Sequence, residues 1–211
     1  MKMNLNKPFV LVGASGHGMV VAEIIEDNGG VLSIFVDAAP ELQEQSGYKV
    51  VQHIDAIPDI EEKQFIISIG NNSTRKKVTE LHPNVSYGTA IHPSAQISKR
   101  AAIGEGTVVM AGVCVNSKAS IGKHCILNTR CSIDHECVIE DYVHVSPGAA
   151  LAGNVAVGEG THIGTGAAII QNITIGKWCT IGAGAVVLHD VPDYATVVGV
   201  PGRVIKINPH E

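Results

Sequence analysis

The sequence has few aromatic residues, no run of basic residues longer than three and no hydrophobic stretch long enough to cross a membrane. Aromatic residues make up 4% of the chain and hydrophobic residues as a whole 45%, so we expect a core of Ile, Val and Ala. The net charge of −5 argues against general nucleic-acid binding. It leaves anionic small molecules open, because helix N-termini and backbone amides can hold a phosphate.

The N-terminus also lacks the pattern of a secretory signal. Its apolar run, residues 9–13, is shorter than a signal's hydrophobic region and leads directly into a glycine turn. No stretch approaches the roughly 20 apolar residues of a transmembrane helix. We therefore expect a soluble, cytoplasmic protein.

A six-residue repeat runs from Ile91 to Val187. Every sixth residue across this stretch is Ile, Leu or Val, and the residue four places after each is uncharged and in most cases small. This pattern is typical of a parallel β-helix of hexapeptide repeats, in which three hexapeptides form one triangular coil. Residues eighteen apart should therefore stack vertically, about 4.8 Å from one another.

Four of the five cysteines occupy the small inward position of this repeat, namely Cys125, Cys131, Cys137 and Cys179. Cys125 and Cys179 share a column, but they are three coils apart. That separation is about 14 Å at the strand spacing, which is beyond the reach of a disulfide. We expect buried free thiols that act as small hydrophobes in a reducing compartment.

The residues before the repeat read as an α/β domain. Residues 8–13 indicate a buried strand, Gly13 to Gly18 a glycine-rich turn, and the apolar pattern that follows a helix ending at residues 28–30. A second strand, residues 31–36, ends at Asp37. A further strand at residues 64–69 leads through Gly70 into another helix, and both turns should emerge at the carboxyl edge of a parallel sheet.

This arrangement is typical of nucleotide-binding domains, although the turn reads G-x-x-G-x-G rather than the dinucleotide G-x-G-x-x-G. The residues alone leave a ligand loop and a simple tight turn equally open. We predict two domains: a Rossmann-like domain at residues 1–87, and a β-helix with a C-terminal cap at residues 88–211.

The eighteen-residue stacking rule places candidate catalytic residues together. His135 and Glu136 lie at a corner, and Gly153 should stack directly over His135. A glycine there leaves room and an approachable backbone amide beside the imidazole. Histidine suits general-base catalysis near neutral pH, and either Glu136 or Asp134 could orient it. Solvated corner residues without a catalytic role are the alternative reading.

Two further pairs should form vertical ladders: His144 with His162 on an outward strand position, and Asn154 with Asn172 at a corner. A flat-sided prism has no deep pocket of its own, so a binding cleft should form between subunits. A three-sided prism favours a threefold oligomer, and we expect a homotrimer.

These residues together resemble the hexapeptide-repeat, left-handed β-helix acyltransferases. Within them the chain resembles the bacterial nucleotide-aminosugar N-acetyltransferases, which are grouped with sialic-acid O-acetyltransferase-like proteins. Its likeness is greatest to the branch that acetylates UDP-4-amino-4,6-dideoxy-N-acetylglucosamine on the way to diacetylbacillosamine. The shared segments are Gly13 to Gly18, Gly70-Asn71-Asn72 with Arg75-Lys76-Lys77, Leu127-Asn128-Thr129, His135-Glu136-Cys137-Val138-Ile139, His144-Val145-Ser146 and Ala152-Gly153-Asn154-Val155.

The resemblance implies a left-handed helix, acetyl-CoA as donor, no metal, and acetylation of the 4-amino group of a nucleotide-linked, UDP-type, 4-amino-4,6-dideoxy sugar. It assigns His135 as the base, Glu136 as the residue that raises its basicity, and the Gly153 amide as an oxyanion donor. It places acetyl-CoA against His144, Gly153, Thr165 and Ala183. It places the nucleotide-sugar against Ser15, Gly16, His17, Asp37 and Gly70. The family often has two acids where this chain has Asp37-Ala38.

Three other functions fit parts of the pattern. The same fold could acetylate a sugar hydroxyl, which needs stronger base assistance than an amine. Some trimeric β-helices hold zinc between histidines of two subunits, and this chain supplies His124, His135, His144 and His162. A nucleotide-sugar sensor without catalysis is the third alternative.

Overall fold

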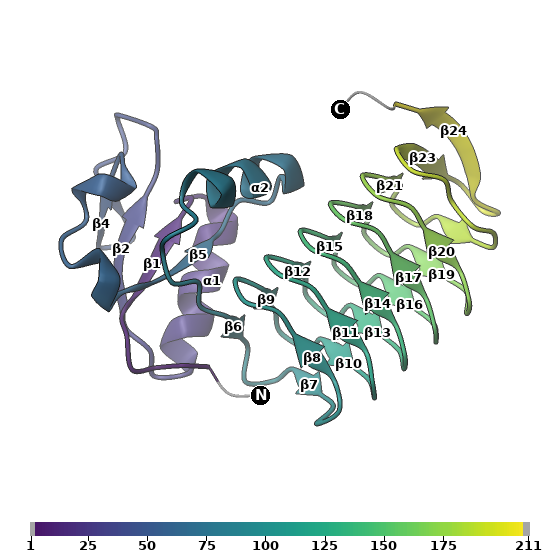
Figure 1. Ribbon diagram of the computed structural model, residues 1–211, viewed down its shortest axis with the longest axis horizontal. Helices are drawn as coiled ribbons and strands as arrows, with labels where there is room; N and C mark the ends of the chain where they lie inside the picture. Colours follow the sequence, from purple (N-terminus) through teal and green to yellow (C-terminus); the bar gives the residue numbers. More distant parts are fainter. Residues whose placement is uncertain (1–2, 209–211) are drawn as a thin grey trace.

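In the computed structural model, which describes residues 3–208, an α/β domain lies beside the first coils of a long β-helix (Figure 1). The two predicted parts are both present, and the exact boundary between residues 87 and 88 stays a prediction. Within the described residues, no helix is both long and apolar enough to cross a membrane.

The α/β domain contains a five-stranded sheet in the order β3-β4-β2-β1-β5. Strands β1, β2, β4 and β5 run parallel, and β3 pairs antiparallel with β4. The elements are β1 (Phe9–Val12), α1 (Gly16–Asp27), β2 (Leu32–Val36), β3 (Glu44–Gln45), β4 (Tyr48–Val51), the short 3₁₀ helices η1 (Ile54–Ala56) and η2 (Ile60–Glu62), β5 (Gln64–Ile67) and α2 (Asn72–Leu81).

The strand order brings the two glycine turns together. Strand β1 lies between β2 and β5, so the turns that follow β1 and β5 leave the sheet side by side at its carboxyl edge. Ser68 joins them, because its Oγ donates a 2.7 Å hydrogen bond to the carbonyl of Gly13. The two glycine turns therefore share the carboxyl edge of the parallel sheet, as the sequence predicted, and this is the edge at which such sheets bind ligands.

The β-helix has three faces, built from two-residue strands that pair in parallel with the strand eighteen residues away. The first face contains β6 (Ala90–Ile91), β9 (Val108–Val109), β12 (Ile126–Leu127), β15 (His144–Val145), β18 (His162–Ile163), β21 (Thr180–Ile181), β23 (Ala195–Val198) and β24 (Arg203–Ile207). The second contains β7 (Gln96–Ile97), β10 (Cys114–Val115), β13 (Ser132–Ile133), β16 (Ala150–Leu151), β19 (Ala168–Ile169) and β22 (Val186–Val187). The third contains β8 (Ala102–Ile103), β11 (Ser120–Ile121), β14 (Val138–Ile139), β17 (Ala156–Val157) and β20 (Thr174–Ile175).

The coils form the left-handed parallel β-helix that the repeat and the resemblance predict. The aliphatic residue of each hexapeptide points inward; Ile133, Val145 and Ile163, for example, are fully buried. Burial of these columns, at about 25 cal/mol per Å² of apolar surface, is the main force that holds the coils together.

Two corner positions of each repeat restrict the residue, one because space is short and the other because its backbone is left-handed. At Gly104 the φ angle is not positive, but a Cβ there would lie 2.5 Å from the backbone of Gly122, so crowding explains this glycine. The left-handed backbone belongs instead to the third corner residue, which is Glu136 with φ 60° at the candidate catalytic corner. This φ angle costs energy for a non-glycine residue, and it recurs at Tyr142 and Asn154 in the same repeat position.

The inward cysteines pack in the core as free thiols. Cys125, Cys131 and Cys137 are fully buried. Burial raises the pKa of Cys125 and of Cys131 to about 12, so both remain protonated and unreactive in the folded protein.

The stack ends in a hairpin. Strand β23 pairs in parallel with β21, and β24 returns antiparallel along β23. Every residue of β24 is exposed. This hairpin covers the end of the first face, where an unpaired strand edge would otherwise remain.

Candidate active site

His135 and Gly153 lie next to each other on one edge of the β-helix, the edge where the second and third faces meet between β13 and β14. A Cβ on Gly153 would come within 2.5 Å of the His135 ring carbon Cε1 and 2.6 Å of Nε2. The imidazole therefore occupies space that any other residue would fill. The stacking is fixed by the backbone, since the amide of Asn154 donates to the His135 carbonyl at 2.9 Å.

Carboxylates surround His135 on its other side. Its Nδ1 lies 3.4 Å from Oε2 of Glu136, while Oε1 of the same carboxylate accepts a 2.9 Å hydrogen bond from Lys118. Asp134 accepts from the His135 backbone amide at 2.7 Å and from Asn116 at 2.8 Å. The hydrogen bond from Lys118 lowers the pKa of Glu136, and that from Asn116 lowers the pKa of Asp134, so both carboxyl groups are charged at neutral pH.

This geometry determines what the imidazole can do. A charged Glu136 beside Nδ1 favours the tautomer with its proton on Nδ1, which leaves Nε2 as an acceptor on the Gly153 side. Among the described residues, no protein acceptor receives the Gly153 N–H. The corner thus presents a proton acceptor and a free amide donor side by side, with the His135 side chain 58% exposed.

His144 and His162 form a second imidazole group on the first face. Their rings stack with centroids 4.9 Å apart and planes 15° from parallel, so the predicted ladder exists. His144 Nε2 contacts the Asn128 amide at 3.2 Å, and His162 Nε2 contacts the Ser146 hydroxyl at 2.8 Å. Burial and the neighbouring His162 lower the pKa of His144 to about 3, and burial also lowers that of His162. Both imidazoles are therefore neutral hydrogen-bonding groups near pH 7, and His144 is half-buried rather than fully exposed.

Asp37 holds the glycine turn in place. Its Oδ2 accepts a 2.9 Å hydrogen bond from the amide of Ala14, and its Oδ1 accepts a 3.0 Å bond from the amide of Ala39. A carboxylate has further lone pairs, so it can still accept from a ligand hydroxyl. Gly13 is required at the start of the turn, because its φ is 111° and a Cβ would lie 2.9 Å from the Ser68 carbonyl oxygen.

The other predicted substrate residues line the same edge. Ser15 and Gly16 are exposed at the start of α1, and the Ser15 side chain makes no cap hydrogen bond. Burial lowers the pKa of His17 to about 4, and its buried Nε2 has no hydrogen-bond partner within the described residues. Gly70 is exposed in the β5–α2 turn, with open space where a side chain would project. Ser15, Gly16 and Gly70 are therefore accessible at this edge, whereas the unpaired Nε2 of His17 is buried.

One chain does not bring all the predicted site residues together. The glycine turns face the first face of the β-helix, and His17 is one of the groups that, after burial, lower the pKa of His144. His135 and Gly153 lie on the opposite edge, between the second and third faces, in the corners that follow β13 and β16. Thr165 and Ala183 are exposed on a third edge, between the first and second faces, and they stack through the hydrogen bond from Gly184 to Thr165 at 2.8 Å.

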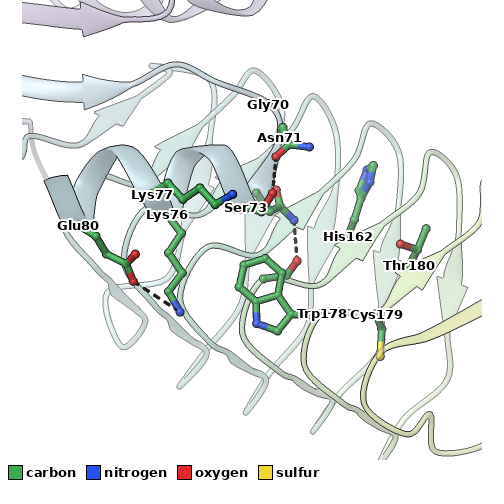
Figure 2. Close-up of a pocket in the computed structure, with 12 residues that line it drawn as sticks. Gly70, Asn71, Ser73, Lys76, Lys77, Glu80, His162, Trp178, Cys179 and Thr180 are labelled. Atoms are coloured by element: carbon green, nitrogen blue, oxygen red, sulfur yellow. Dashed lines mark hydrogen bonds and ion pairs between the residues drawn. The ribbon is translucent and has the colours of Figure 1, made fainter. Parts of the chain in front are cut away.

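A cavity of about 920 Å³ lies between the first turns of α2 and the first face of the β-helix (Figure 2). Gly70 and His162 both line it, which makes it continuous with the edge that carries the glycine turns. Lys76 pairs with Glu159 at 2.5 Å, and its Nζ lies 5.5 Å from the Trp178 ring. The α/β domain and the β-helix are therefore joined by polar contacts around an open space.

The hydrogen-bond partners of Glu136 and Asp134, and the burial of Arg75, were not predicted from the sequence. Lys118 and Asn116 lie eighteen residues before Glu136 and Asp134, so the stacking rule could have found both. Arg75 gave no such signal, because it stands in a run of three basic residues on a polar helix and only the fold shows that it is buried.

The comparisons with known proteins identify the family to which this fold belongs. The model of the PglD N-terminal domain matches residues 9–81, and that of the bacterial transferase hexapeptide (six repeats) matches residues 154–189. None of the curated proteins compared with the chain matches it significantly by sequence.

Among solved structures, a variant of perosamine N-acetyltransferase from Caulobacter crescentus, in complex with CoA and GDP-perosamine, is 36% identical with a TM-score of 0.91. The match covers 98% of this chain and 100% of that one. The chain belongs to the PglD family of hexapeptide-repeat sugar N-acetyltransferases.

Two other members of the family are equally complete matches. The acetyltransferase domain of PglB from Neisseria gonorrhoeae FA1090 is 36% identical with a TM-score of 0.90, and the match covers 95% of this chain and 100% of that one. WeeI from Acinetobacter baumannii AYE is 32% identical with a TM-score of 0.88, over 94% and 100% of the two chains. The family likeness thus includes both the α/β domain and the β-helix.

The PglD-family fold also separates the histidines that a zinc centre would need. His124 is buried under α2, where its ring stacks on Tyr142 with centroids 5.4 Å apart. His135 lies on another edge, and only His144 and His162 are in contact. Within residues 3–208 no three His, Cys, Asp or Glu side chains are grouped for a metal ion. A zinc site would therefore have to be completed by histidines of more than one chain.

Proposed function

We propose that this enzyme transfers the acetyl group of acetyl-CoA to the 4-amino group of a UDP-linked 4-amino-4,6-dideoxy sugar. The observation that carries the proposal is the contact of His135 with Gly153 on one side and Glu136 on the other. Relatives that cover the whole chain support the donor and the substrate class, since their structures contain CoA with GDP-perosamine, or acetyl coenzyme A.

In the proposed reaction, Nε2 of His135 accepts a proton from the sugar amine as its nitrogen attacks the thioester carbonyl carbon. The Gly153 N–H donates to the oxyanion that develops on that carbonyl. The tetrahedral intermediate then collapses, the C–S bond breaks, and the CoA sulfur takes a proton from the imidazolium. No covalent enzyme intermediate is needed, and the charged Glu136 stabilises the transient imidazolium.

We further propose that the enzyme acts as a homotrimer with each site between two subunits. The glycine turns and the His135 corner lie on different sides of one chain, so a second copy must supply the missing half. The triangular section of the β-helix favours threefold packing. His144, Thr165 and Ala183 of one subunit would then line the acetyl-CoA path toward the His135 of its neighbour.

Complementation tests the shared site. His135→Ala and Asp37→Ala should each be nearly inactive alone, and co-expression should restore activity in mixed trimers that pair an intact glycine turn with an intact base. Lack of any restoration in isolated mixed trimers, or a monomer by light scattering at micromolar concentration, would contradict the shared site.

The nucleotide is tested with UDP-, GDP- and dTDP-linked 4-amino sugars, in thermal-shift and thiol-release assays with acetyl-CoA. At equal concentration, a ligand that binds the folded state more tightly raises the melting temperature more, so UDP-sugars should give the largest shift and the highest turnover. A preference for GDP-sugars would overturn the choice of UDP alone. Acetylation of the matching 4-hydroxy sugar but not the 4-amino sugar would instead favour the O-acetyltransferase.

We also propose a cytoplasmic location, because the buried cysteines are free thiols, as a reducing compartment would keep them. Fractionation of cells followed by detection of the protein would test this location.

A further inference from the structure

Arg75 is a buried cation without a carboxylate partner. The residue is 1% exposed, and among the described residues no ion pair involves it. Burial lowers its pKa to about 10, so the guanidinium is charged at neutral pH. A buried charge is costly unless its donors are all satisfied, and a position that bears this cost has a specific role.

The guanidinium donates to neutral oxygens on both parts of the molecule. Toward the β-helix, Nε donates to the carbonyl of His124 at 2.7 Å and Nη2 to the carbonyl of Tyr142 at 2.7 Å. Toward the α/β domain, Nη1 donates to the carbonyl of Ile69 at 3.0 Å, with a longer contact of 3.4 Å to Gly70. One planar group thus ties the β5–α2 turn to two successive coils.

Asn72 extends this contact to a third coil. Its Oδ1 accepts from Arg75 Nη2 at 2.9 Å, and its Nδ2 donates to the carbonyl of Gly160 at 2.9 Å. Residues 124, 142 and 160 are eighteen apart, so they form one vertical column of corner carbonyls. We call it the carbonyl column.

Both ends of this network reach residues of the proposed site. His144 follows Tyr142 by two residues, and His162 follows Gly160 by two. At the other end, Ser68 connects the β5–α2 turn to Gly13 through its 2.7 Å hydrogen bond. A continuous set of hydrogen bonds therefore runs from the first glycine turn to the strands that present the imidazole pair.

We propose that Arg75 is a positioning residue, which fixes the nucleotide-sugar turns of the α/β domain at one height and orientation relative to the imidazole pair of the β-helix. This inference rests on the proposed function for its catalytic consequence. The geometry itself stands on the hydrogen bonds alone. Arginine suits this role because its rigid planar fork presents five donors at once, whereas lysine offers three donors on a single point charge.

The charge of Arg75 also affects the imidazoles of the proposed site. It contributes to lowering the pKa of His17, His144 and His162, and so helps keep these imidazoles neutral. Arg75→Lys would preserve the charge and lose the fork. Asn72→Ala would remove the hydrogen bond to the Gly160 carbonyl and one acceptor of the guanidinium, and would leave Arg75 in place.

The test compares wild type, Arg75→Lys and Asn72→Ala, with Arg203→Lys as a control on the exposed β24 strand. Acetyl-transfer kinetics are measured well below each melting temperature, together with the stoichiometry of CoA binding by calorimetry. We expect kcat/KM for the nucleotide-sugar to fall about 10²-fold in Arg75→Lys, because a misplacement of about 1 Å has an effect of this size. The fall in Asn72→Ala should be smaller. CoA stoichiometry should stay at the wild-type value, and the control should match wild type.

Hydrogen–deuterium exchange gives a readout that does not depend on turnover. Both variants should exchange faster than wild type in residues 69–72 and 142–145, with no change in β13 and β14. Wild-type kinetics in both variants would overturn the catalytic part of the inference, as would a loss explained wholly by fewer CoA-binding sites. Unchanged exchange in both segments would overturn the geometric part.

The two proposals fail in different ways. If wild type transfers acetyl to none of the nucleotide-linked amino sugars, the proposed function fails. The role of Arg75 in fixing the two domains is then tested by hydrogen–deuterium exchange alone. Faster exchange in both segments supports this role, and unchanged exchange overturns it. If wild type is active and the variants are equally active, only the role of Arg75 fails.

Discussion

His135 and His144 are the same residue type on the same β-helix, yet their surroundings differ in every respect. His135 is 58% exposed beside a charged carboxylate and a glycine. His144 is half-buried against another imidazole, and burial lowers its pKa to about 3. An imidazole that must gain and lose a proton needs the first environment, and one that must stay neutral needs the second. The surroundings, not the residue type, separate a proton acceptor from a hydrogen-bonding contact.

The largest effects are expected when each of the two imidazoles is removed in turn. His135→Ala should lower kcat by roughly 10²- to 10⁴-fold, the size of a general-base effect, with the oligomer intact by light scattering. His144→Ala should act mainly on the KM for acetyl-CoA, since it removes a contact rather than the base. His53→Ala, at an exposed position in the α/β domain, is the control. Near-wild-type kcat in His135→Ala would reverse the assignment.

Gly153→Ala tests whether the contact with His135 matters. The new methyl group would overlap the ring atoms that now lie 2.5 and 2.6 Å from its position, so the imidazole must turn away. A fall of about 10²-fold in kcat is expected from this displacement. Gly148→Ala is the control for a methyl group added at a corner where it meets nothing; because Gly148 has a φ of 67° and Gly153 has no positive φ, the control carries more backbone strain than Gly153→Ala. A fall in kcat in Gly148→Ala as large as that in Gly153→Ala would show that the ring contact is not responsible.

Glu136→Gln tests how much the carboxylate charge beside His135 contributes to kcat. Its charge is held by Lys118 and lies 3.4 Å from Nδ1, so its loss should reduce kcat by a fraction of the general-base effect, roughly tenfold. Glu105→Gln removes a carboxylate with a similar exposed lysine partner, Lys123, and should leave kcat unchanged. Both variants neutralise a carboxylate that pairs with an exposed lysine, but Glu136 is the one that lies beside Nδ1 of His135. A tenfold loss in both would contradict the role of Glu136.

The smallest effect concerns stability rather than turnover. Because the pKa of His144 is lowered from 6.5 to about 3, the unfolded chain binds a proton in this pH range that the folded chain does not. Stability should therefore fall as the pH decreases from 6.5 toward 3, by about 1.4 kcal/mol per pH unit for this group. His144→Gln should flatten the dependence by that amount in chemical denaturation, whereas Thr180→Gln on the same face should not. An unchanged slope would show that His144 titrates normally.

The β-helix was predictable in detail because its geometry is periodic. Counting eighteen residues from His135 leads to Gly153, and the same step connects Thr165 with Ala183. The approach failed where no period exists. The half-burial of His144 depends on how the α/β domain packs against the first face, and no local pattern shows it.

The α/β domain was predictable only as a pattern of elements. Its strands, turns and helices were foreseen, and so was the shared edge of its two glycine turns. That Asp37 binds the amides of Ala14 and Ala39 depends on contacts between loops, which spacing does not encode. Arg75 is the clearest case, because its buried guanidinium donates to two carbonyls of the coils, those of His124 and Tyr142, which lie 49 and 67 residues away in the sequence.

The carbonyl column has a consequence for how the two domains can be joined. All coils of a regular prism look alike to a docking helix, so a slip by one layer would move the α/β domain by only about 4.8 Å. A slip by one layer would carry Arg75 from the carbonyls of His124 and Tyr142 to those of Tyr142 and Gly160, which are equivalent acceptors. The side chains that differ between coils must therefore select the layer, and α2 meets two of them: the Tyr142 hydroxyl, 2.8 Å from that of Thr79, and Glu159, which pairs with Lys76.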